Sequence, residues 1–576
     1  MKQLQKLYQK YNNCITNLIF PLILLVYPLV KINQGIDVSD STYSLSNYLF
    51  FDRLEGTWVI STYLSNVVGW LLTNLPLGTT LLGMNLYTGL IVGGLALGMY
   101  YLMRKWMPAW IVFMGEFIAI GFLWIPTTIL YNYLTYVLFS LGAVFLYKAL
   151  AEEKDKLLML AGFFLGLNVW VRIPNLAEMA LIVCVWYYCY LQKGKGQFNV
   201  AVRKTGLSIG GYVLGVCVPL IFILFQYGFA GIIEMIQGLS QMQSGDDSYS
   251  IFSMITATIH AYIRTGKWAG FIVAGIVMGL AMFALKKDCF VMPKKVLYLV
   301  CVVVLIRFFW GRGMFSFRYY EDYTSMYEWG MIGLYLAIAA CIYLLIGKGV
   351  SSQERLWGMI TLVIICITPL GSNNYTYQNL NNLFVAAPVT LYAFVKWFRR
   401  RYPAEKTVLL FPTKAMLSVL AFMILLQSTG FHFQFVFRDG MDGTKRDTVL
   451  TGPSVVAGMK TTEENAENIS GLLNYIQTEG ETEEIICFGD CPGLPFLLQK
   501  PTAVDSAWPD LDSEPVEKLE ENLLSLEAFP TVIIRHTEPT SDSFNTKKEL
   551  LLDYMGANHY KTVYENAAYT VYQAQE

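Results

Sequence analysis

Two carboxylates, Asp37 and Asp40, follow directly after the first apolar segment of the chain. A carboxylate just outside a membrane face can act as a general base toward a hydroxyl group, or it can help to hold a divalent cation. Carboxylates in loops are usually just solvated, so the signal here is the position of these two at the end of an apolar segment. We therefore expect Asp40, alone or together with Asp37, to be catalytic.

Four arginines are candidates for binding an anionic group such as a lipid phosphate. Arg172 lies where one apolar segment ends and the next begins, and Arg307 lies within an apolar run. An arginine near the bilayer core costs about 2.5–3.5 kcal/mol on insertion scales, so it indicates either an anionic ligand or a side chain that reaches the lipid headgroups. Arg312 and Arg318 follow in the next loop. We expect these arginines to bind the phosphate of a lipid-linked substrate.

Two acidic pairs lie in other loops, Asp246-Asp247 and Glu321-Asp322. Carboxylates from separate loops could form one acceptor site or metal site, although solvated loop residues are the simpler interpretation. The metal requirement stays open, with a divalent cation as one possibility. The segment 371–376, Gly-Ser-Asn-Asn-Tyr-Thr, could hydrogen-bond a sugar, or it could be a plain turn.

The composition limits which functions are possible. Hydrophobic residues make up 55% of the 576 residues and charged residues 15%, against about 25% charged residues in a typical soluble domain. The net charge of -1 argues against a nucleic-acid partner. None of the 4 histidines has metal-ligand spacing to another, which argues against a zinc site. Cys487 and Cys491 could form a disulfide or stay as two thiols.

Apolar segments predict a polytopic α-helical membrane protein, because about 20 residues cross the hydrocarbon layer. The chain contains about thirteen such segments, at approximately 15–32, 80–103, 109–125, 134–150, 157–172, 174–191, 206–225, 268–285, 296–311, 328–346, 357–371, 383–398 and 415–432. Two further apolar stretches, 58–72 and 229–239, are expected to be helices in the plane of the membrane interface.

Basic residues predict the orientation of these helices, since cytoplasmic loops carry an excess of lysine and arginine. Alternate loops of this chain are short and basic, including 104–105, 154–156, 193–204, 286–295 and 399–414. We therefore expect a cytoplasmic N-terminus in the cell membrane. An odd number of spans then places the C-terminus outside the cytoplasm.

The residues after 432 have the composition of a soluble α/β domain. Strands are predicted at 484–488 and 531–536, with a terminal hairpin at 560–573. Helices are predicted at 461–475, 514–529 and 546–555, the first of them opened by a capping box between Thr461 and Glu464. The expected organisation is a transmembrane domain, 1–432, followed by a small extracytoplasmic α/β domain, 433–576.

These features together resemble the C superfamily of glycosyltransferases, which take sugars from polyprenyl-linked donors. In that superfamily an Asp-Glu pair with an aromatic residue a few positions later usually follows the first helix. Asp40-Ser41-x-Tyr43 matches the aspartate and approximately the aromatic, and Ser41 replaces the glutamate. This departure leaves open whether Asp40 alone is the base or Asp37 shares its role. The resemblance covers the whole chain.

The resemblance implies a membrane glycosyltransferase that acts on the outer face. Its donor would be a polyprenyl-phosphate-linked sugar, its surroundings membrane lipid, and its acceptor an unidentified glycan, lipid or protein. Two other classes remain: a transporter of lipid-linked sugars, and a polysaccharide polymerase or ligase. A transporter usually shows internal repeats and interrupted helices, neither of which is visible in the sequence. A polymerase would more naturally use a long central outer loop than a folded C-terminal domain.

Overall fold

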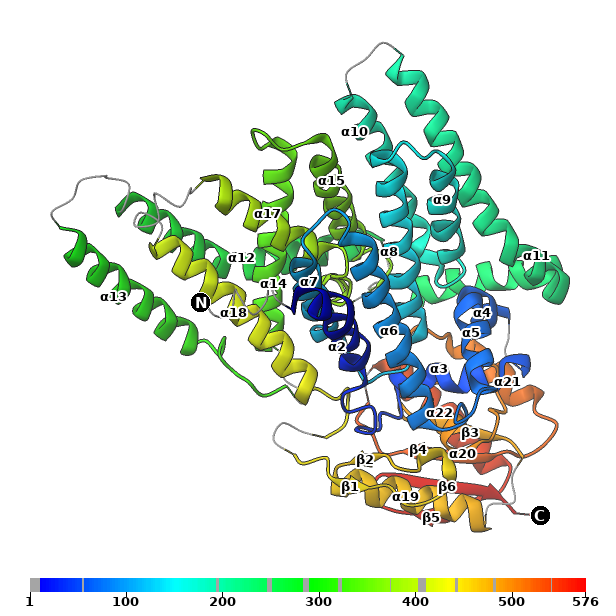
Figure 1. Cartoon of the computed structure of the whole chain (residues 1–576). Helices are drawn as coiled ribbons and strands as arrows, with labels where there is room; N and C mark the ends of the chain where they lie inside the picture. Colours follow the sequence, from blue (N-terminus) through cyan, green and yellow to red (C-terminus); the bar gives the residue numbers. More distant parts are fainter. Residues whose placement is uncertain are drawn as a thin grey trace.

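The computed structural model describes residues 11–53, 56–192, 196–245, 251–282, 290–319, 324–372, 374–401, 411–440, 444–479, 483–539 and 541–575. A large bundle of helices forms most of the molecule, and a small α/β region lies at one end of it (Figure 1). Three short helices of the first loop, α3 (Asp40–Leu49), α4 (Gly56–Ser61) and α5 (Tyr63–Thr73), lie between the bundle and the α/β region.

The bundle contains a helix at each apolar segment that the sequence indicates. The first consists of η1 (Ile15–Ile19), α2 (Phe20–Val26) and η2 (Tyr27–Leu29). The others are α6 (Leu81–Met103), α7 (Ala109–Gly121), α8 (Leu130–Ala151), α9 (Lys156–Asn168), η4 (Ile173–Ile182) with α10 (Val183–Leu191), α11 (Gln197–Gly245), α12 (Ile251–Met282), α13 (Val291–Trp310), α14 (Thr324–Ile346), α15 (Ser352–Ile367), α17 (Ala386–Arg401) and α18 (Phe411–Gln434). A short helix, α16 (Thr376–Asn381), precedes α17.

The chain is a mostly helical, integral membrane protein, but the expected number of spans is not confirmed. Among the described residues, 7 helices are long and apolar enough to cross a membrane, and the two shorter helices α7 and α9 are also apolar. Several of the other expected segments are short, such as α15 with 16 residues, whereas a full crossing takes about 20. The prediction of about thirteen spans therefore counted helices that do not all meet the length of a full crossing.

Helices α9 and α11 pack with their backbones unusually close. Each carries two glycines spaced by four positions, Gly162 and Gly166 on α9 and Gly211 and Gly215 on α11. A Cβ atom added at Gly162 would lie 2.1 Å from the Ser208 carbonyl oxygen, and one at Gly211 would lie 2.0 Å from the Met159 carbonyl oxygen. Small residues at this spacing allow close helix association in membranes. The contact fixes α9, whose end leads into Arg172.

Helix α11 changes direction at Gly228, whose φ of 65° and ψ of −168° are not helical. The sequence predicts a spanning helix at 206–225 and a separate interface helix at 229–239. Gly228 lies in the gap between these two predicted helices, so the break agrees with the prediction, and the second part packs against α4. A glycine permits the positive φ at the turn because it has no Cβ.

The α/β region after α18 contains a four-stranded sheet with the order β3-β4-β6-β5. Its strands are β3 (Ile485–Phe488), β4 (Thr531–Arg535), β5 (Tyr560–Glu565) and β6 (Tyr569–Ala574). β3 and β4 are parallel, with Ile485 opposite Thr531, and β6 is antiparallel to both β4 and β5. The two strands and the terminal hairpin that the sequence predicts are present at the expected positions.

Helices cover this sheet: α19 (Glu463–Glu479), α20 (Leu494–Leu498), α21 (Val516–Ser525) and α22 (Asp542–Ala557). A short strand pair, β1 (Thr448–Val449) with β2 (Lys460–Thr461), and a turn of helix, η7 (Ser454–Val456), precede α19. The predicted capping box is wrong by one residue. Thr462 Oγ1 accepts the hydrogen bond from the Asn465 amide at 3.2 Å, while the Thr461 hydroxyl is taken by the Asp439 carboxylate. The boundary predicted at 432/433 stays a prediction.

The first loop binds the α/β region through backbone contacts. The Gly493 amide donates a hydrogen bond to the Val38 carbonyl oxygen at 2.8 Å, and the Ser46 hydroxyl donates to the Pro492 carbonyl oxygen at 3.0 Å. A Cβ atom at Gly493 would lie only 1.8 Å from Thr42 Oγ1. Only glycine lets α3 approach the α/β region this closely, so the position of α3 depends on this residue.

We expect Gly493→Ala to weaken the docking of the α/β region onto α3. Gly493 has an ordinary right-handed conformation with a φ of −83°, so the new methyl group acts through its clash with Thr42. Overpacking of this kind typically costs about 1–3 kcal/mol. Thermal unfolding of the purified protein in detergent, followed by tryptophan fluorescence, should show a lower Tm.

Gly556→Ala is the matched control, because a Cβ atom at this position on α22 meets no atom within 4 Å. It should leave the Tm unchanged or slightly higher, since alanine favours the helix. Equal stability of the two variants would contradict the close contact between α3 and Gly493.

Candidate functional site

A cavity of about 640 Å³ lies between the helical bundle and the α/β region. Its wall on the bundle side includes Asn132, Arg172, Ser372 and Asn374, and Asp40 lies at its edge on α3. The wall on the side of the α/β region includes Asp490 after β3, and Thr537 and Glu538 after β4. Trp508, Asp510 and Asp512, from the segment between α20 and α21, complete it. The cavity brings together side chains from both ends of the chain and from several loops of the bundle.

Asp37 holds the first turn of α3 in place. Its Oδ1 accepts hydrogen bonds from the amide and hydroxyl of Ser39 at 2.9 and 2.6 Å, and its Oδ2 accepts from the amide and hydroxyl of Ser41 at 2.8 and 2.9 Å. The side chain is buried, with 6% of its surface exposed. Aspartate commonly bonds to backbone amides just after itself in this way. Both carboxylate oxygens are thus occupied by the chain's own donors.

Asp40, in contrast, presents its carboxylate to the cavity. It is the first residue of α3, and 36% of its side-chain surface is accessible. Its charged partner is Arg438, whose Nη2 lies 3.5 Å from Asp40 Oδ2. The two aspartates, three positions apart in sequence, therefore face different surroundings: Asp37 binds backbone, and Asp40 faces open space.

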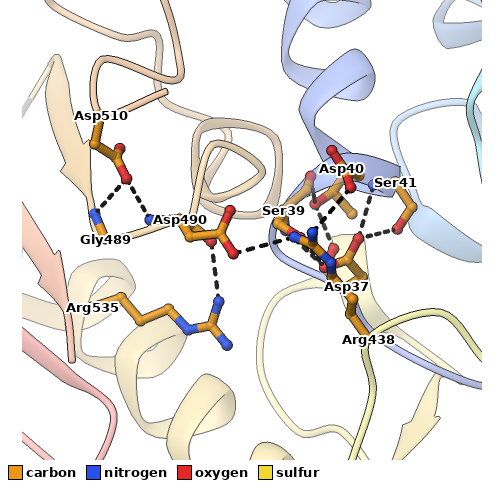
Figure 2. Close-up of polar contacts among 10 residues, drawn as sticks. Asp37, Ser39, Asp40, Ser41, Arg438, Gly489, Asp490, Asp510 and Arg535 are labelled. Carbon is orange, nitrogen blue, oxygen red and sulfur yellow. Dashed lines mark hydrogen bonds and ion pairs between the residues drawn. The ribbon is translucent and has the colours of Figure 1, made fainter. Parts of the chain in front are cut away.

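Arg438 lies between two carboxylates (Figure 2). Its Nη1 is 3.2 Å from Asp490 Oδ2 and donates to the Ser39 hydroxyl at 2.8 Å, while its Nη2 approaches Asp40. Asp490 is itself held by its backbone: its amide donates to Asp510 Oδ2 at 2.7 Å, and its carbonyl accepts from Arg535 at 3.0 Å. This network fixes the geometry between α3 and the end of β3.

Both Arg438 and Asp490 have positive φ angles, 45° and 56°. Residues other than glycine adopt this conformation at a cost of order 1–3 kcal/mol, and such residues cluster at functional sites. Here the conformation allows the two side chains to meet across the interface between the bundle's last helix and the sheet.

Burial raises the pKa values of the carboxyl groups of Asp40 and Asp490, and the positive charge of Arg438 opposes this rise. Burial in the cavity raises the pKa of Asp40 to about 6. The positive charge of Arg438 lowers this pKa, and the negative charges of Asp37 and Asp490 raise it. Burial also raises the pKa of Asp490 to about 6, against the effects of Arg438 and Arg535. Burial raises the pKa of Asp510, although the backbone amides of Asp490 and Gly489 oppose it. A carboxyl group whose pKa is about 6 is mostly ionised at neutral pH and is a stronger base than an ordinary aspartate.

Arg172 is held at the bundle side of the cavity by a buried polar network. The side-chain amide of Asn168 donates to both oxygens of Glu178, at 2.9 and 2.8 Å, and to the Thr135 carbonyl at 3.1 Å. The chain turns after Asn168 and brings Arg172 Nη1 within 3.4 Å of Asn132 Oδ1. Arg172 Nε is buried and has no hydrogen-bond partner among the described residues. The guanidinium therefore retains donor capacity for an anion.

Three residues of the segment 371–376 line the same cavity: Gly371, Ser372 and Asn374. Residue 373 lies outside the described residues. Gln378 Nε2 donates to the Ser372 hydroxyl at 3.3 Å, and Gln378 Oε1 accepts from Tyr136 at 2.6 Å. The segment is therefore an ordered group of amides and hydroxyls beside Arg172, on the bundle side of the cavity.

The structure does not bring the other predicted arginines to the cavity. Arg307 is exposed near the end of α13, Arg312 is exposed with its guanidinium 5.5 Å from the Phe308 ring centre, and Arg318 is exposed in the following segment. None of the three lines the cavity of Asp40. The acidic residues Asp246, Asp247, Glu321 and Asp322 lie outside the described residues.

Reasoning from sequence missed the residues of the α/β region, above all Arg438, Asp490 and Asp510. One signal was available for Asp490. Ligand sites of open α/β sheets lie at the carboxyl ends of parallel strands, and Gly489-Asp490 follows directly after a predicted strand. Arg438 carries no such signal, because nothing in its sequence neighbourhood points to a carboxylate more than fifty positions away in the chain.

Among the described residues, no group of three or more histidine, cysteine, aspartate or glutamate side chains is arranged to hold a metal ion. Asp40 and Asp490 face an arginine instead. Cys487 and Cys491 are separate thiols, and the Cys491 thiol donates to the Phe488 carbonyl at 3.3 Å.

The chain matches solved structures over nearly its whole length. The apo form of the Archaeoglobus fulgidus oligosaccharyltransferase matches with a TM-score of 0.47 and 12% identity, covering 99% of this chain and 75% of that one. The complex of the same enzyme with zinc and sulfate matches with a TM-score of 0.45 and 12% identity, covering 90% and 68%. ArnT from Cupriavidus metallidurans in the apo state matches with a TM-score of 0.34 and 12% identity, covering 97% of both chains.

All three TM-scores are below 0.5, and all three identities are 12%. No protein-family model matches the chain, and no curated protein matches it in sequence. At such TM-scores and identities the likeness carries nothing about the site, so its chemistry follows from its own residues.

We expect the protonation of Asp40 to respond in opposite directions to changes in its two neighbours. Arg438→Gln removes the positive charge and should raise the pKa of Asp40 above 6. Asp490→Asn removes a negative charge and should lower it. Infrared difference spectra recorded across a pH titration report the carboxyl group, and spectra of the Asp40→Asn variant identify its band. Shifts in the same direction for both variants would contradict the described contacts.

Proposed function

We propose that this protein is a membrane glycosyltransferase that moves a sugar from a polyprenyl-phosphate-linked donor to an acceptor hydroxyl. The observation that carries the proposal is that Asp40 and Arg172 line one cavity. A base and a phosphate-binding cation that line one cavity are the two groups that this reaction needs. The resemblance of Asp40-Ser41-x-Tyr43 to the superfamily motif supports the same assignment.

In the proposed step, Asp40 takes the proton of the acceptor hydroxyl as its oxygen attacks the anomeric carbon. A bond forms between that oxygen and the anomeric carbon, and the bond between the anomeric carbon and the phosphate oxygen breaks. The electron pair of the broken bond stays with the leaving polyprenyl phosphate. General-base assistance of this kind contributes about 10²–10⁴-fold to the rate.

Arg172 offsets the charge that develops on the leaving phosphate. Its buried Nε has no partner among the described residues, and Asn132 orients its guanidinium. Fixed donors that point at the position where charge develops stabilise the transition state. Ser372, Asn374 and Gln378 line the same wall and offer further polar groups to the phosphate or the donor sugar.

The proposed location of the cavity is the outer face of the cell membrane. The bias of lysine and arginine toward alternate loops supports a cytoplasmic N-terminus. Nucleotide sugars do not occur outside the cytoplasm, so an outer-face transferase takes its sugar from a lipid carrier. The first loop and the α/β region, which form the cavity together, then both lie outside.

Asp40→Asn should lower the rate of sugar transfer by about 10²–10⁴-fold, because the amide keeps the shape of the side chain but does not accept the proton. The measurement is transfer from polyprenyl-phosphate-linked sugars by purified protein in liposomes. In the wild type the rate should rise with pH and be half-maximal near pH 6, since the pKa of Asp40 is about 6 and the ionised form is active.

Asp52→Asn is the matched control in the same loop, since Asp52 is exposed and does not line the cavity. Its rate should equal that of the wild type.

Asp37→Asn should lower the Tm, because an amide group facing the Ser39 and Ser41 donors leaves buried groups unpaired at a cost of about 1–3 kcal/mol. A wild-type rate for Asp40→Asn, or efficient transfer from a nucleotide sugar without lipid carrier, would refute the proposal.

Arg172→Gln should lower transfer by about 10²–10³-fold, the usual effect of removing one donor to a developing oxyanion. Arg172→Lys keeps the charge but loses the planar fork, so its rate should be intermediate. Arg307→Gln tests the other arginine that the sequence singles out. Because Arg307 lies on α13 and outside the cavity lining, we expect little change. A large loss with Arg307→Gln and none with Arg172→Gln would move the phosphate site to α13.

A further inference from the structure

The two walls of the cavity differ in charge. The bundle wall carries Arg172 together with neutral amides and hydroxyls. The wall of the α/β region carries acidic side chains, Asp490, Asp510, Asp512 and Glu538. Arg438 lies at one end of this wall, where its Nη1 is 3.2 Å from Asp490 Oδ2. An anionic phosphate is therefore favoured at the first wall and repelled by the second.

The surroundings of Asp510 indicate that a ligand binds at the acidic wall. The residue is 5% exposed, and its Oδ2 accepts from the amides of Gly489 and Asp490 at 3.2 and 2.7 Å. Its Oδ1 is buried and has no partner among the described residues, and the same holds for Thr537 Oγ1 nearby on this wall. Buried polar atoms are rarely left without a partner, so a hydroxyl or ammonium group of a ligand would complete them.

An aromatic side chain stands on the same wall. Trp508 lines the cavity, and its ring lies 5.5 Å from the ring of Tyr43 on α3. The face of an aromatic ring is electronegative and attracts the positive edges of C–H groups, which one face of a sugar ring presents. An aromatic face beside hydrogen-bond acceptors is a surface suited to a sugar.

A second cavity of about 680 Å³ continues from this wall. It lies between α21, α4 and the part of α11 beyond Gly228, and Asp512 lines both cavities. Its lining also includes the acidic residues Glu234, Glu514, Glu517 and Glu521, together with the apolar Pro515 and Val516. Lys518, also in the lining, is paired to Asp505 at 3.0 Å. Acidic lining thus runs from the candidate site past Asp512 to the surface of α21.

We propose that the acceptor is a carbohydrate chain of more than one sugar unit that is uncharged or carries amines. The inference rests on the proposed function and adds the acceptor's class and path. The reacting end lies against Trp508 and Asp510, and the units behind it pass Asp512 into the second cavity. The carboxylates accept hydrogen bonds from hydroxyl or ammonium groups and disfavour phosphates and uronic acids.

The test uses charge reversal on α21, where Glu517 and Glu521 are exposed and line the second cavity. Binding of glucose, glucosamine, their oligosaccharides and galacturonic acid oligosaccharides is measured on full-length protein in detergent. Neutral and amine-bearing oligosaccharides should bind more tightly than the single sugars, and the uronic acid chains weakest. The double variant Glu517→Lys and Glu521→Lys should weaken binding of glucosamine oligosaccharides by about tenfold, which corresponds to about 1.4 kcal/mol.

Glu520→Lys is the matched control, because Glu520 is exposed on the same helix but does not line the cavity. It should bind all the sugars as the wild type does. The inference would be overturned if the control lost as much binding as the double variant, or if single sugars bound as tightly as chains. It would also be overturned if uronic acid chains bound preferentially, or if no neutral or amine-bearing chain bound. Binding with this pattern but without transfer from any lipid-linked sugar would instead count against the proposed function alone.

Discussion

The geometry of the site depends on Arg438, a single cation between two carboxylates from distant parts of the chain. Burial raises the pKa of both Asp40 and Asp490, and the guanidinium limits the rise, so that each stays near 6. Without the arginine, two acids facing one cavity would repel each other, and at least one would take up a proton. With it, the same contact that joins α3 to the α/β region also sets the basicity of Asp40. The contacts of Arg438 with Asp40 and Asp490 therefore affect both the docking of the two parts and the pKa of Asp40.

The α/β region is therefore part of the cavity itself. Asp490 and Thr537 follow the parallel strands β3 and β4, and the carboxyl ends of parallel strands are where α/β sheets generally present ligand sites. The loop that carries Asp510 fixes the turn after β3 through two amide hydrogen bonds. The bundle supplies the complementary wall. The cavity needs both parts in their docked positions, and the close packing of Gly493 against Thr42 helps to fix α3, which carries Asp40.

Local sequence patterns predicted the elements and one part of the site, and they failed where the chain folds back on itself. The helices and strands were predictable because apolar runs and alternation are local signals. Asp40 and Arg172 could be singled out because each stands at the end of an apolar segment, and the structure brings both to one cavity. The break at Gly228 also falls in the gap between the two helices predicted at 206–225 and 229–239. Arg438 could not be identified, because its partners are set by tertiary contacts.

Asp37 and Asp40 are the same residue type, but they have different hydrogen-bond partners and different exposure in the structure. Sequence alone left open whether they share one role, since both follow the first apolar segment. In the structure, four short hydrogen bonds from Ser39 and Ser41 saturate Asp37, which makes its carboxylate part of the helix start. Asp40 begins that helix and has its accessible surface in the cavity. Environments that divide two acids in this way commonly assign them different functions. The first aspartate fixes the helix, and the helix in turn fixes where the second one points.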